Sequence, residues 1–250
     1  MEERRIMIRH LEELSMNAWP ALQTLLYDGW IVRFANGYTK RANSVNPLYF
    51  STGNVEEKIT ACEWLYRREN LGVVFKMTSA VCPEDLDESL ARCGYRLHAP
   101  TSVQTLGLND VDGHPATDST LAEAPLEEWL RDLCRLNGVD DRHRVTLRQM
   151  LGNLVPQGGF ISLRHGGQVV ACGMGVVQDG FVGLFDIVTD AGFRNRGFGR
   201  QVVLDLLAWG KSRGAHTAYL QAMLDNGPAL RLYSKVGFRE VYQYWYRVKP

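Results

Sequence analysis

The segment of residues 186–209, "DIVTDAGFRNRGFGRQVVLDLLAW", constrains the fold more than any other part of this chain. An apolar, β-prone stretch passes through a loop of arginines and glycines directly into a helix with an apolar face. The start of a helix carries unpaired N–H groups and roughly half a positive charge, and glycines let an anion approach the backbone closely. The loop therefore predicts an anion site at a strand-to-helix turn. A turn whose arginines are only solvated is the alternative that the loop alone leaves open.

Two common phosphate-binding loops do not fit this segment. A Walker A loop requires a lysine followed by serine or threonine after its second glycine, and the stretch from Arg194 to Gly199 is followed by neither. A dinucleotide-binding fingerprint requires three glycines early in a strand-helix-strand unit, whereas this loop follows antiparallel hairpins. The spacing R-x-x-G-x-G thus predicts a pyrophosphate cradle of another kind.

The charge balance limits the partners that the chain can take. Its 28 lysines and arginines equal its 28 aspartates and glutamates, so no overall positive field draws it to nucleic acid. No stretch of about 18 apolar residues predicts a membrane span, and the charged start "MEERRIMIRHLEEL" is unlike a signal peptide. The five cysteines form no pattern typical of a metal site or a disulfide framework. We expect a cytoplasmic protein that binds neither nucleic acid, membrane nor metal.

Residues 109–124 are poor in large apolar side chains and rich in Asp, Gly, Pro, Ser and Thr, which is the composition of a linker. They separate an N-terminal domain at 1–108 from a C-terminal domain at 125–250. The C-terminal domain is predicted to contain two helices, three strands with turns at Gly166-Gly167 and Asp179-Gly180, and then helix, strand, helix and strand. Hairpins followed by a strand-helix-strand crossover predict an α/β protein with a mixed sheet.

The N-terminal half repeats this order of elements faintly. An offset of 143 residues takes Asp179-Gly180 to Asn36-Gly37, and Gly237-Phe238 to Gly94-Tyr95, without a gap. A helix, a strand, a helix and a strand are then expected at 56–70, 72–78, 84–95 and 101–108, in the same order as in the C-terminal half. We therefore expect a partial duplication in which residues 1–27 supply one helix at most. Two unrelated α/β pieces are the alternative.

A second motif, "DNGPALRLYSKVGF", lies downstream of the loop. With both motifs the chain resembles the GCN5-related N-acetyltransferase (GNAT) superfamily: Arg194–Gly199 matches its Q/R-x-x-G-x-G/A loop, and Asn226–Phe238 matches its N-x-x-A-x-x-x-Y-x-x-x-G-F segment. The resemblance runs from about residue 120 to the C-terminus. It implies a GNAT fold in the C-terminal half with a partial GNAT-like repeat in the N-terminal half.

The resemblance implies acetyl-CoA as co-substrate and no metal. In GNAT enzymes the backbone of the strand before the loop pairs with the pantetheine arm, and here that strand is centred on Ile187 and Val188. The N–H of Val188 would also polarise the thioester carbonyl, which an amine attacks directly in a ternary complex. Asn226 equally fits a helix cap. The expected cofactor-binding residues are Ile187, Val188, Arg194, Asn195, Arg196, Gly197, Phe198, Gly199, Arg200 and Asn226.

The resemblance also implies an acid for the reaction and leaves the base open. Tyr233 matches the tyrosine of the superfamily that protonates the departing sulfur, although a single tyrosine on an amphipathic helix is also a common packing residue. Asp186 precedes Val188 by two residues, so strict alternation puts both on one face and makes Asp186 a candidate base. A solvated or salt-bridged Asp186 is the alternative, and Gln221 and Asp225 are further candidates for substrate contact.

The offset of 143 residues replaces the active groups in the N-terminal half. It puts Ser51, Asn54 and Glu56 where the C-terminal loop has its arginine and two glycines, and Leu90 where it has its tyrosine. We expect an N-terminal unit that cannot hold acetyl-CoA in the usual way, an arrangement that resembles tandem GNAT proteins whose C-terminal unit does the chemistry. Polar residues of its hairpin region either line the substrate cleft or solvate a strand face: Arg33, Lys40, Arg41, Asn43 and Asn46.

These motifs predict an acetyl-CoA-dependent N-acetyltransferase that acts on a primary amine of a small molecule or peptide. One alternative is an acyl-CoA-binding regulatory protein without turnover, and Tyr233 counts against it because sensing requires no proton donor. Another is an acyltransferase with a different donor such as aminoacyl-tRNA. The neutral charge balance and the intact loop count against that donor.

Overall fold

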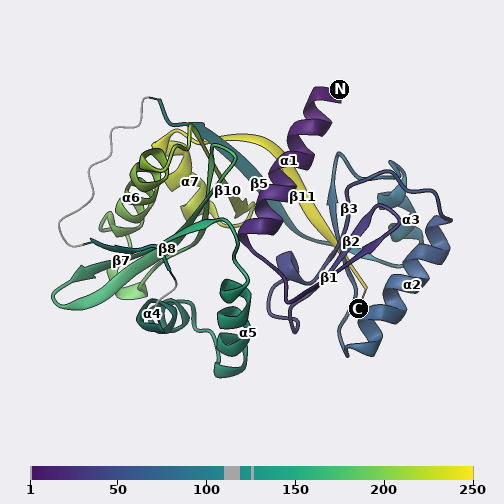
Figure 1. Cartoon of the computed structure of the whole chain (residues 1–250), viewed down its shortest axis with the longest axis horizontal. Helices are drawn as coiled ribbons and strands as arrows, with labels where there is room; N and C mark the ends of the chain where they lie inside the picture. Colours follow the sequence, from purple (N-terminus) through teal and green to yellow (C-terminus); the bar gives the residue numbers. More distant parts are fainter. Residues whose placement is uncertain (1, 110–118, 125–126, 250) are drawn as a thin grey trace. The chain divides into compact units, whose positions relative to one another are not determined.

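The computed structural model describes residues 2–109, 119–124 and 127–249. The chain divides into two compact units (Figure 1). We call Met1–Ser102 with Met223–Asp225 and Tyr242–Pro250 the N-terminal unit, and Val103–Ala222 with Asn226–Val241 the C-terminal unit. The bounds of these units differ from those of the domains 1–108 and 125–250 expected from composition. The main difference is that the last segment of the chain belongs to the N-terminal unit.

The elements of the second half follow the predicted order, and the mixed α/β fold class is confirmed. Both hairpins turn where predicted, at Gly166-Gly167 and Asp179-Gly180, and all four of these residues have positive φ. The elements are α4 (Glu127–Asn137), α5 (Asp141–Gly152), β7 (Gln157–His165), β8 (Gln168–Gln178), β9 (Phe181–Thr189), α6 (Phe198–Ser212), β10 (Thr217–Met223), α7 (Gly227–Val236) and β11 (Arg239–Val248).

One strand of the C-terminal unit lies where composition predicts linker. Strand β6 (Ser119–Ala122) pairs antiparallel with β7, from Ser119 opposite Leu163 to Ala122 opposite Phe160. Short, largely polar strands are typical of sheet edges, and such a strand differs little from a linker in composition. Residues 110–118 of the expected linker lie outside the described residues. In this unit the strand order is β5-β10-β9-β8-β7-β6, in which β9 and β10 are parallel.

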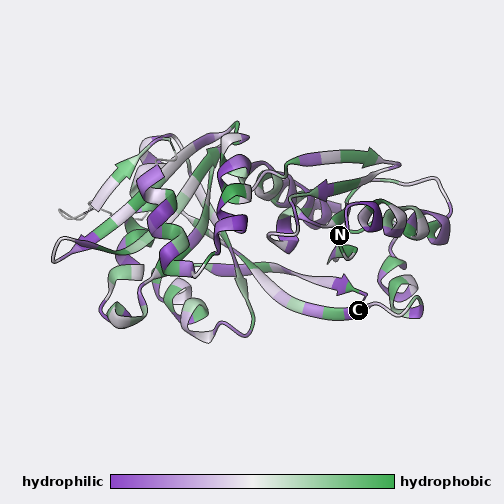
Figure 2. Cartoon of the chain, turned by 90° about the horizontal axis from the view of Figure 1, so that it is seen from below, coloured by the Kyte–Doolittle hydropathy of each residue, from purple (hydrophilic) through white to green (hydrophobic). Residues whose placement is uncertain are grey.

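Helix α6 packs against the antiparallel strands of the C-terminal unit. The ring of Trp209 fits into space that glycines leave on the sheet, because a Cβ at Gly159 would come within 2.7 Å of the ring and one at Gly175 within 2.9 Å. Hydrophobic and hydrophilic residues share the surface of most helices (Figure 2). Within the described part of the chain, no helix has the length and apolar character that a membrane span needs.

The helices and the later strands of the N-terminal unit lie near the predicted ranges, but residues 1–27, which we expected to supply one helix at most, also contain a strand at Gln23–Tyr27. Strand order is β1-β2-β3-β4-β11, with β3 and β4 parallel and the neighbouring pairs β1–β2, β2–β3 and β4–β11 antiparallel. Helices α2 and α3 lie side by side (Figure 1). The elements are α1 (Glu2–Ala18), β1 (Gln23–Tyr27), β2 (Trp30–Phe34), the 3-10 helix η1 (Lys40–Ala42), β3 (Val45–Pro47), α2 (Val55–Arg68), β4 (Val74–Thr78), α3 (Leu86–Arg92) and β5 (Arg96–Gly107).

From helix α2 onward, the elements of the two halves match at the predicted offset, whereas β1 and β2 both fall at the single strand β8. Helix α2 corresponds to α6, β4 to β10 and α3 to α7. The turn at Asn36-Gly37 has φ values of 52° and 74°, and the turn at Asp179-Gly180 has values of 49° and 75°. Gly94 and Gly237 both follow a helix with positive φ, and in each case the next residue donates its N–H to a helical carbonyl at 3.0 Å. This agreement supports duplication over two unrelated pieces.

The last strands of the two repeats are exchanged. Strands β5 and β11 correspond to each other at the same offset, but β4 lies beside β11 and β10 lies beside β5. Strand β11 pairs with β4 from Tyr244 opposite Thr78 to Val248 opposite Val74. Each repeat is therefore completed by the strand of the other.

Three of the polar residues expected to line a cleft or solvate a strand do neither, because they are buried. Arg33 is 3% exposed and donates to the carbonyls of Arg41, Met16 and Trp19 at 2.8, 3.0 and 2.6 Å. The carbonyl oxygen of the Asn43 side chain accepts from the N–H groups of Ala35 and Gly37. The side-chain amide of Asn46, which is 1% exposed, donates to the carbonyl of Ser44. Their side chains thus form hydrogen bonds with backbone N–H and C=O groups of the loops, which strand pairing does not satisfy.

A buried ion pair joins helix α1 to strand β4. The Nζ atom of Lys76 lies 2.5 Å from Oε2 of Glu12, and both side chains are almost fully enclosed. The hydroxyl of Tyr242, on β11, donates to Oε1 of the same carboxylate at 2.7 Å. The Lys76 ammonium also lies 4.0 Å from the centre of the Tyr244 ring. The final strand is thus fixed to the first helix through one carboxylate.

We predict that Lys76→Met destabilises the protein by about 3–5 kcal/mol, because it leaves the Glu12 carboxylate buried without its counter-ion. Tyr242→Phe removes one hydrogen bond and should cost about 1–2 kcal/mol. Urea unfolding followed by circular dichroism measures both changes. Lys40→Met, at an exposed position of the same unit, is the control and should change little. A Lys76→Met variant as stable as wild type would show that the pair contributes nothing.

Candidate active site

The site begins at an irregularity in strand β9. The pairing of β8 with β9 shifts between Cys172, which faces Val188, and Met174, which faces Phe185, so Asp186 and Ile187 together oppose Gly173. This is a β-bulge, and Asp186 takes a positive φ of 49° in it. A Cβ at Gly173 would lie 2.8 Å from Val202 and 3.2 Å from Ile187, so glycine leaves the room that the bulge needs.

The parallel pairing of β9 with β10 ends beside this bulge. Registered pairs run from Thr217 opposite Phe181 to Leu220 opposite Leu184, whereas β9 continues to Thr189. Backbone groups of the last part of β9 are therefore not used by that register. The predicted contact strand, Ile187 and Val188, lies in this part.

The loop after β9 forms the start of helix α6, as predicted. Gly197 is the N-cap residue with φ of 89°, a conformation in which glycine is strongly favoured. A Cβ on Gly199 would approach Oγ1 of Thr189 to 3.1 Å, so the helix start lies tightly against the end of β9. Asn195 also has a positive φ, of 61°. The backbone bends sharply here and presents the first turn of α6 at the end of the strand.

A cavity of about 550 Å³ brings most of the predicted residues together. It extends from the bulged strand across the loop to helix α7, all within the C-terminal unit. Two predicted residues, Asp186 and Arg196, do not line it. The predicted residues that do are Ile187, Val188, Arg194, Asn195, Gly197, Phe198, Gly199, Arg200, Asn226 and Tyr233.

Helix α7 supplies the last two of these residues. Asn226 caps the helix, since its side-chain oxygen accepts from the N–H of Ala229 at 3.2 Å, and it also borders the cavity. Tyr233 is 8% exposed and its ring packs against Phe238 at 6.0 Å. Burial raises the pKa of Tyr233 to about 12. The phenol therefore keeps its proton at neutral pH and can donate it.

Asp186 lies on the β9 bulge, and its charge raises the pKa of two cysteine thiols. Burial raises the pKa of Cys172, on β8, and the Asp186 carboxylate raises it further. Burial also raises the pKa of Cys134, on α4, with Asp186 again contributing. Strict alternation, from which we expected Asp186 and Val188 to share a face, does not hold in this strand because the bulge interrupts it. The role of Asp186 as base stays a prediction.

The structure adds lining residues that sequence reasoning missed. Asn137 ends helix α4 at an Asn-Gly pair, which is the signal that could have marked it as a loop residue near a site. Thr189 and Phe193 belong to the quoted loop segment but to neither motif. Pro228 and Leu232 belong to the second motif, at positions that its pattern leaves unspecified.

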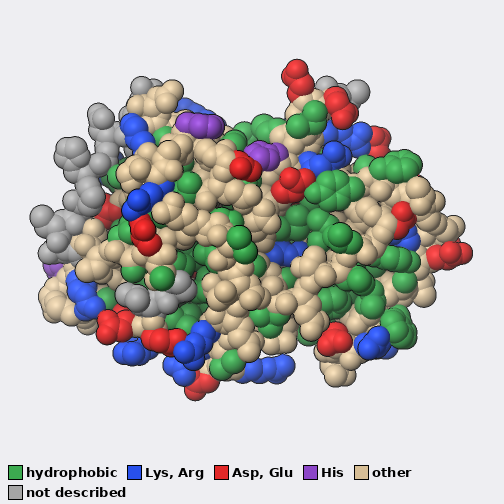
Figure 3. All heavy atoms as spheres, in the orientation of Figure 1, with side chains coloured by type: hydrophobic (Ala, Val, Ile, Leu, Met, Phe, Trp, Pro, Cys, Tyr) green, Lys and Arg blue, Asp and Glu red, His purple; other side chains and the backbone are tan. Residues whose placement is uncertain are grey.

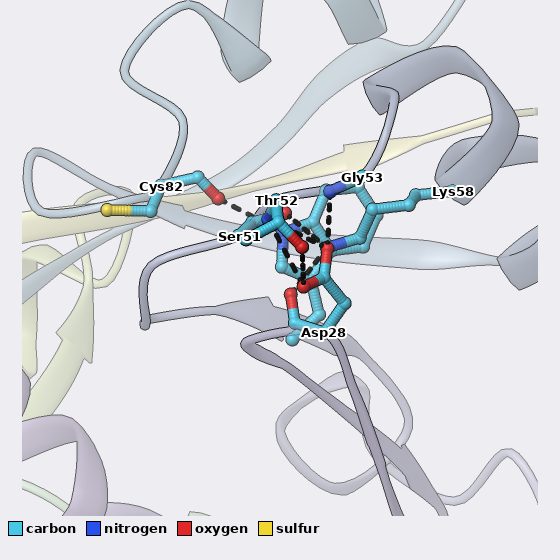
Figure 4. A network of polar contacts seen from close by, with 7 residues as sticks. Asp28, Ser51, Thr52, Gly53, Lys58 and Cys82 are labelled. Carbon is cyan, nitrogen blue, oxygen red and sulfur yellow. Dashed lines mark hydrogen bonds and ion pairs between the residues drawn. The ribbon is translucent and has the colours of Figure 1, made fainter.

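In the N-terminal unit, the corresponding loop binds a carboxylate of the protein itself (Figure 4). Asp28, in the turn between β1 and β2, accepts from the N–H of Thr52 at 3.0 and 3.1 Å and from the N–H of Gly53 at 2.8 Å. The hydroxyls of Ser51 and Thr52 donate to it as well, each at 2.9 Å. Asn54 caps the first turn of α2 by accepting from two N–H groups. The loop that corresponds to the arginine and glycine loop of the C-terminal unit thus holds a carboxylate of the chain itself.

A buried lysine completes this N-terminal network. Lys58 is 2% exposed, and its Nζ atom lies 3.0 Å from Oδ2 of Asp28 and 2.5 Å from Oγ of Ser51. The ammonium also lies 4.1 Å from the centre of the Trp30 ring. The N–H of Gly53, the Lys58 ammonium and the N–H of Thr52 hold the pKa of the Asp28 carboxyl far below its usual range. Sequence reasoning noted the lost arginine here and missed Asp28 and Lys58.

We predict that Asp28→Asn lowers the stability of the protein at pH 7, because the neutral amide replaces a carboxylate that the folded state stabilises. The depressed pKa of Asp28 means that its contribution is complete above about pH 4 and is lost as the pH falls further. The gap between wild type and variant in urea midpoint should therefore narrow below about pH 4, as followed by tryptophan fluorescence. Asp85→Asn, an exposed position of the same unit, is the control. A gap independent of pH would contradict the assignment.

Comparison with known proteins identifies the family of the chain. Residues 6–247 match the family model described as "Probable histone acetyltransferase Rv0428c C-terminal". YobR of Bacillus subtilis (strain 168), named an uncharacterized N-acetyltransferase, is 28% identical over 249 residues, which cover 97% of this chain and 98% of that protein.

Solved structures share the fold. A GCN5-related N-acetyltransferase from Kribbella flavida matches with a TM-score of 0.69 and 14% identity, over 97% of this chain and 95% of that chain. A tandem GNAT protein from the clavulanic acid biosynthesis pathway matches with a TM-score of 0.60 and 12% identity, over 77% of this chain and 69% of that chain. With a family model that spans both units, the chain belongs to the Rv0428c C-terminal family of GNAT-fold N-acetyltransferases.

Proposed function

We propose that this GNAT-type N-acetyltransferase uses acetyl-CoA and transfers the acetyl group to a primary amine of a small molecule or peptide. The observation that carries the proposal is the cavity of the C-terminal unit. It borders the bulged strand, the arginine and glycine loop and Tyr233 at once. Because these three features have distinct chemical uses, their meeting in one cavity supports catalysis over a structural turn.

The start of helix α6 is suited to the pyrophosphate of acetyl-CoA. Gly197 and Gly199 keep side chains away from the first N–H groups of the helix, and Arg194 and Arg200 border the same space. Helix starts and arginines both favour phosphate groups. The backbone of Ile187 and Val188, past the end of the β9–β10 register, would pair with the pantetheine arm.

Two groups of the chain would act on the reacting thioester. Val188 pairs with Cys172, and Asp190 donates to Val170, so the alternation of the ladder turns the Val188 N–H toward β8. A backbone N–H at the end of β9 that faces away from β8 would instead donate to the thioester oxygen and stabilise the negative charge that develops there when the amine attacks. The Tyr233 hydroxyl would give its proton to the departing sulfur. Acetyl-CoA supplies the activated acyl group, and the attacking amine must lose a proton, which Asp186 would take directly or through water.

The class of amine substrate and the cellular compartment are inferred from the surface charge and from the cysteines. Positive and negative side chains are interspersed on the face drawn in Figure 3, which favours a small or peptidic substrate over nucleic acid. All five cysteines are free thiols, which suits the reducing cytoplasm. We therefore propose a cytoplasmic enzyme whose partner is an amine substrate.

Calorimetric titration with acetyl-CoA tests the proposal, and we expect one binding site for each chain. Gly197→Ala should weaken binding at least tenfold, because it puts a methyl group at the cradle and strains a residue with φ of 89°. Gly214→Ala is the matched control, since Gly214 has φ of 88° at the other end of α6 and equally open surroundings. No heat with wild type would overturn the acetyltransferase proposal. Two equivalent sites would show that the N-terminal unit also binds.

Tyr233→Phe should lower kcat about 100-fold and leave the KM for acetyl-CoA unchanged. General acids contribute roughly 10²- to 10⁴-fold, and a pKa of about 12 lies far from neutral, so we expect the low end of that range. Because the ring remains, packing against Phe238 is kept. Steady-state assays of CoA release with a screened amine measure the effect. Full activity in this variant would assign Tyr233 to packing alone.

A further inference from the structure

Four side chains form a cluster at the rim of the cavity: His165, Phe193, Arg196 and Phe198. His165 is the last residue of β7 and pairs with Gln168 across the Gly166-Gly167 turn. The other three lie on the loop or at the start of α6. This rim cluster joins the β7–β8 hairpin to a loop about 30 positions further along the chain, a distance typical of tertiary contacts that fix loops. Neither motif of the sequence includes His165.

A hydrogen bond lies at the centre of the rim cluster. The guanidinium of Arg196 and Nε2 of His165 are 3.1 Å apart. Because a guanidinium can only donate, Nε2 is the acceptor of this hydrogen bond. The same guanidinium lies 5.1 Å from the centre of the Phe193 ring and 5.4 Å from that of Phe198.

The imidazole also packs against both phenylalanines. Its centre lies 5.8 Å from that of Phe193 and 5.3 Å from that of Phe198. Both phenylalanines line the cavity, whereas His165 and Arg196 do not. The two rings thus form a wall with the cavity on one side, and His165 and Arg196 support that wall.

Arg196 differs from the other two arginines of the loop in that its side chain does not border the cavity. Arg194 and Arg200 border the cavity, and Arg194 donates to the carbonyl of Thr189 in the preceding strand at 3.4 Å. Arg196 instead extends to a different hairpin. Its contact with His165 therefore limits the freedom of the loop without occupying the ligand space.

We propose that His165 is a positioning residue for acyl-CoA binding, which acts by holding Arg196 and the two phenylalanines so that the cradle is formed before the ligand arrives. This inference rests on the proposed function. Ordering a loop on binding costs free energy, and a loop that is already ordered binds more tightly. His165 would thus affect the affinity for the nucleotide half of acetyl-CoA and have no part in the chemical step.

His165→Ala should raise the KM for acetyl-CoA about fivefold and leave kcat within about twofold. The hydrogen bond and ring packing that this change removes are exposed and worth on the order of 1 kcal/mol, which converts to about fivefold. His165→Gln should restore much of the affinity, because its side-chain oxygen can accept from Arg196 in place of Nε2. His216→Ala is the matched control. That histidine is also exposed and packs against a phenylalanine, Phe181, but Phe181 does not line the cavity, unlike Phe193 and Phe198.

A double-mutant cycle separates positioning from a general structural role. In an Arg196→Ala background, His165→Ala should raise the KM by less than it does in wild type, because the contact with Arg196 is already gone and only the packing against the two phenylalanines is lost. An equal increase in both backgrounds would overturn the inference, as would a loss in kcat with KM unchanged.

Measurements on the wild-type protein distinguish a failure of this inference from a failure of the proposed function. Turnover by wild type with the same KM in His165→Ala would overturn the inference alone. Failure of wild type to bind acetyl-CoA would overturn the proposed function and this inference with it.

Discussion

Both units of this protein are organised by one requirement, which is that the N–H groups at the start of a helix need an acceptor. In the N-terminal unit, the Asn54 side chain caps α2 by accepting from the N–H groups of Glu56 and Glu57, and the Asp28 carboxylate accepts from those of Thr52 and Gly53 in the loop before the helix. In the C-terminal unit, the equivalent cap position is Gly197, which has no side chain, and the helix start borders a cavity. One repeat caps its helix with its own side chain, and under the proposed function the other leaves its helix start to the ligand.

The β9 bulge is the second feature on which the C-terminal site depends. A regular strand would continue its ladder and use its backbone groups for pairing. The extra residue in β9, opposite a glycine that admits it, interrupts the ladder close to the point where the β9–β10 register ends. Backbone that would otherwise hold the sheet together is then available for a substrate. The cost is an aspartate with left-handed φ, and strain of this kind is common at functional sites.

Much of the fold could be predicted, because turns, apolar spacing and helix termini are local signals. The turns at Gly166-Gly167 and Asp179-Gly180 require positive φ, and the chain has suitable residues there. Features that depend on contacts distant in sequence could not be predicted. Two of the three carbonyls that accept from buried Arg33 lie more than ten residues before it, and the Asp28 network joins a turn to a loop more than twenty residues later.

The candidate site was predictable in its motifs and not in its geometry. Ten of the predicted residues border one cavity. They could be predicted because a strand-loop-helix unit and a capped helix are each formed by consecutive residues, so their motifs can be recognised in the sequence. Arg196 and Asp186 fall outside the cavity for reasons that spacing does not contain. The side chain of Arg196 hydrogen-bonds His165 on another hairpin. A bulge in β9 interrupts the alternation of side chains from which we predicted the position of Asp186.

The exchange of final strands has a consequence for how the protein is made. The N-terminal unit is completed by residues 242–250, so the ribosome has translated nearly the whole chain before that unit has all its parts. Until then, Glu12 and Lys76 lack Tyr242, and β4 lacks its neighbour β11. A cut between the two sequence halves would therefore separate each unit from one of its strands, β11 from the N-terminal unit and β5 from the C-terminal unit.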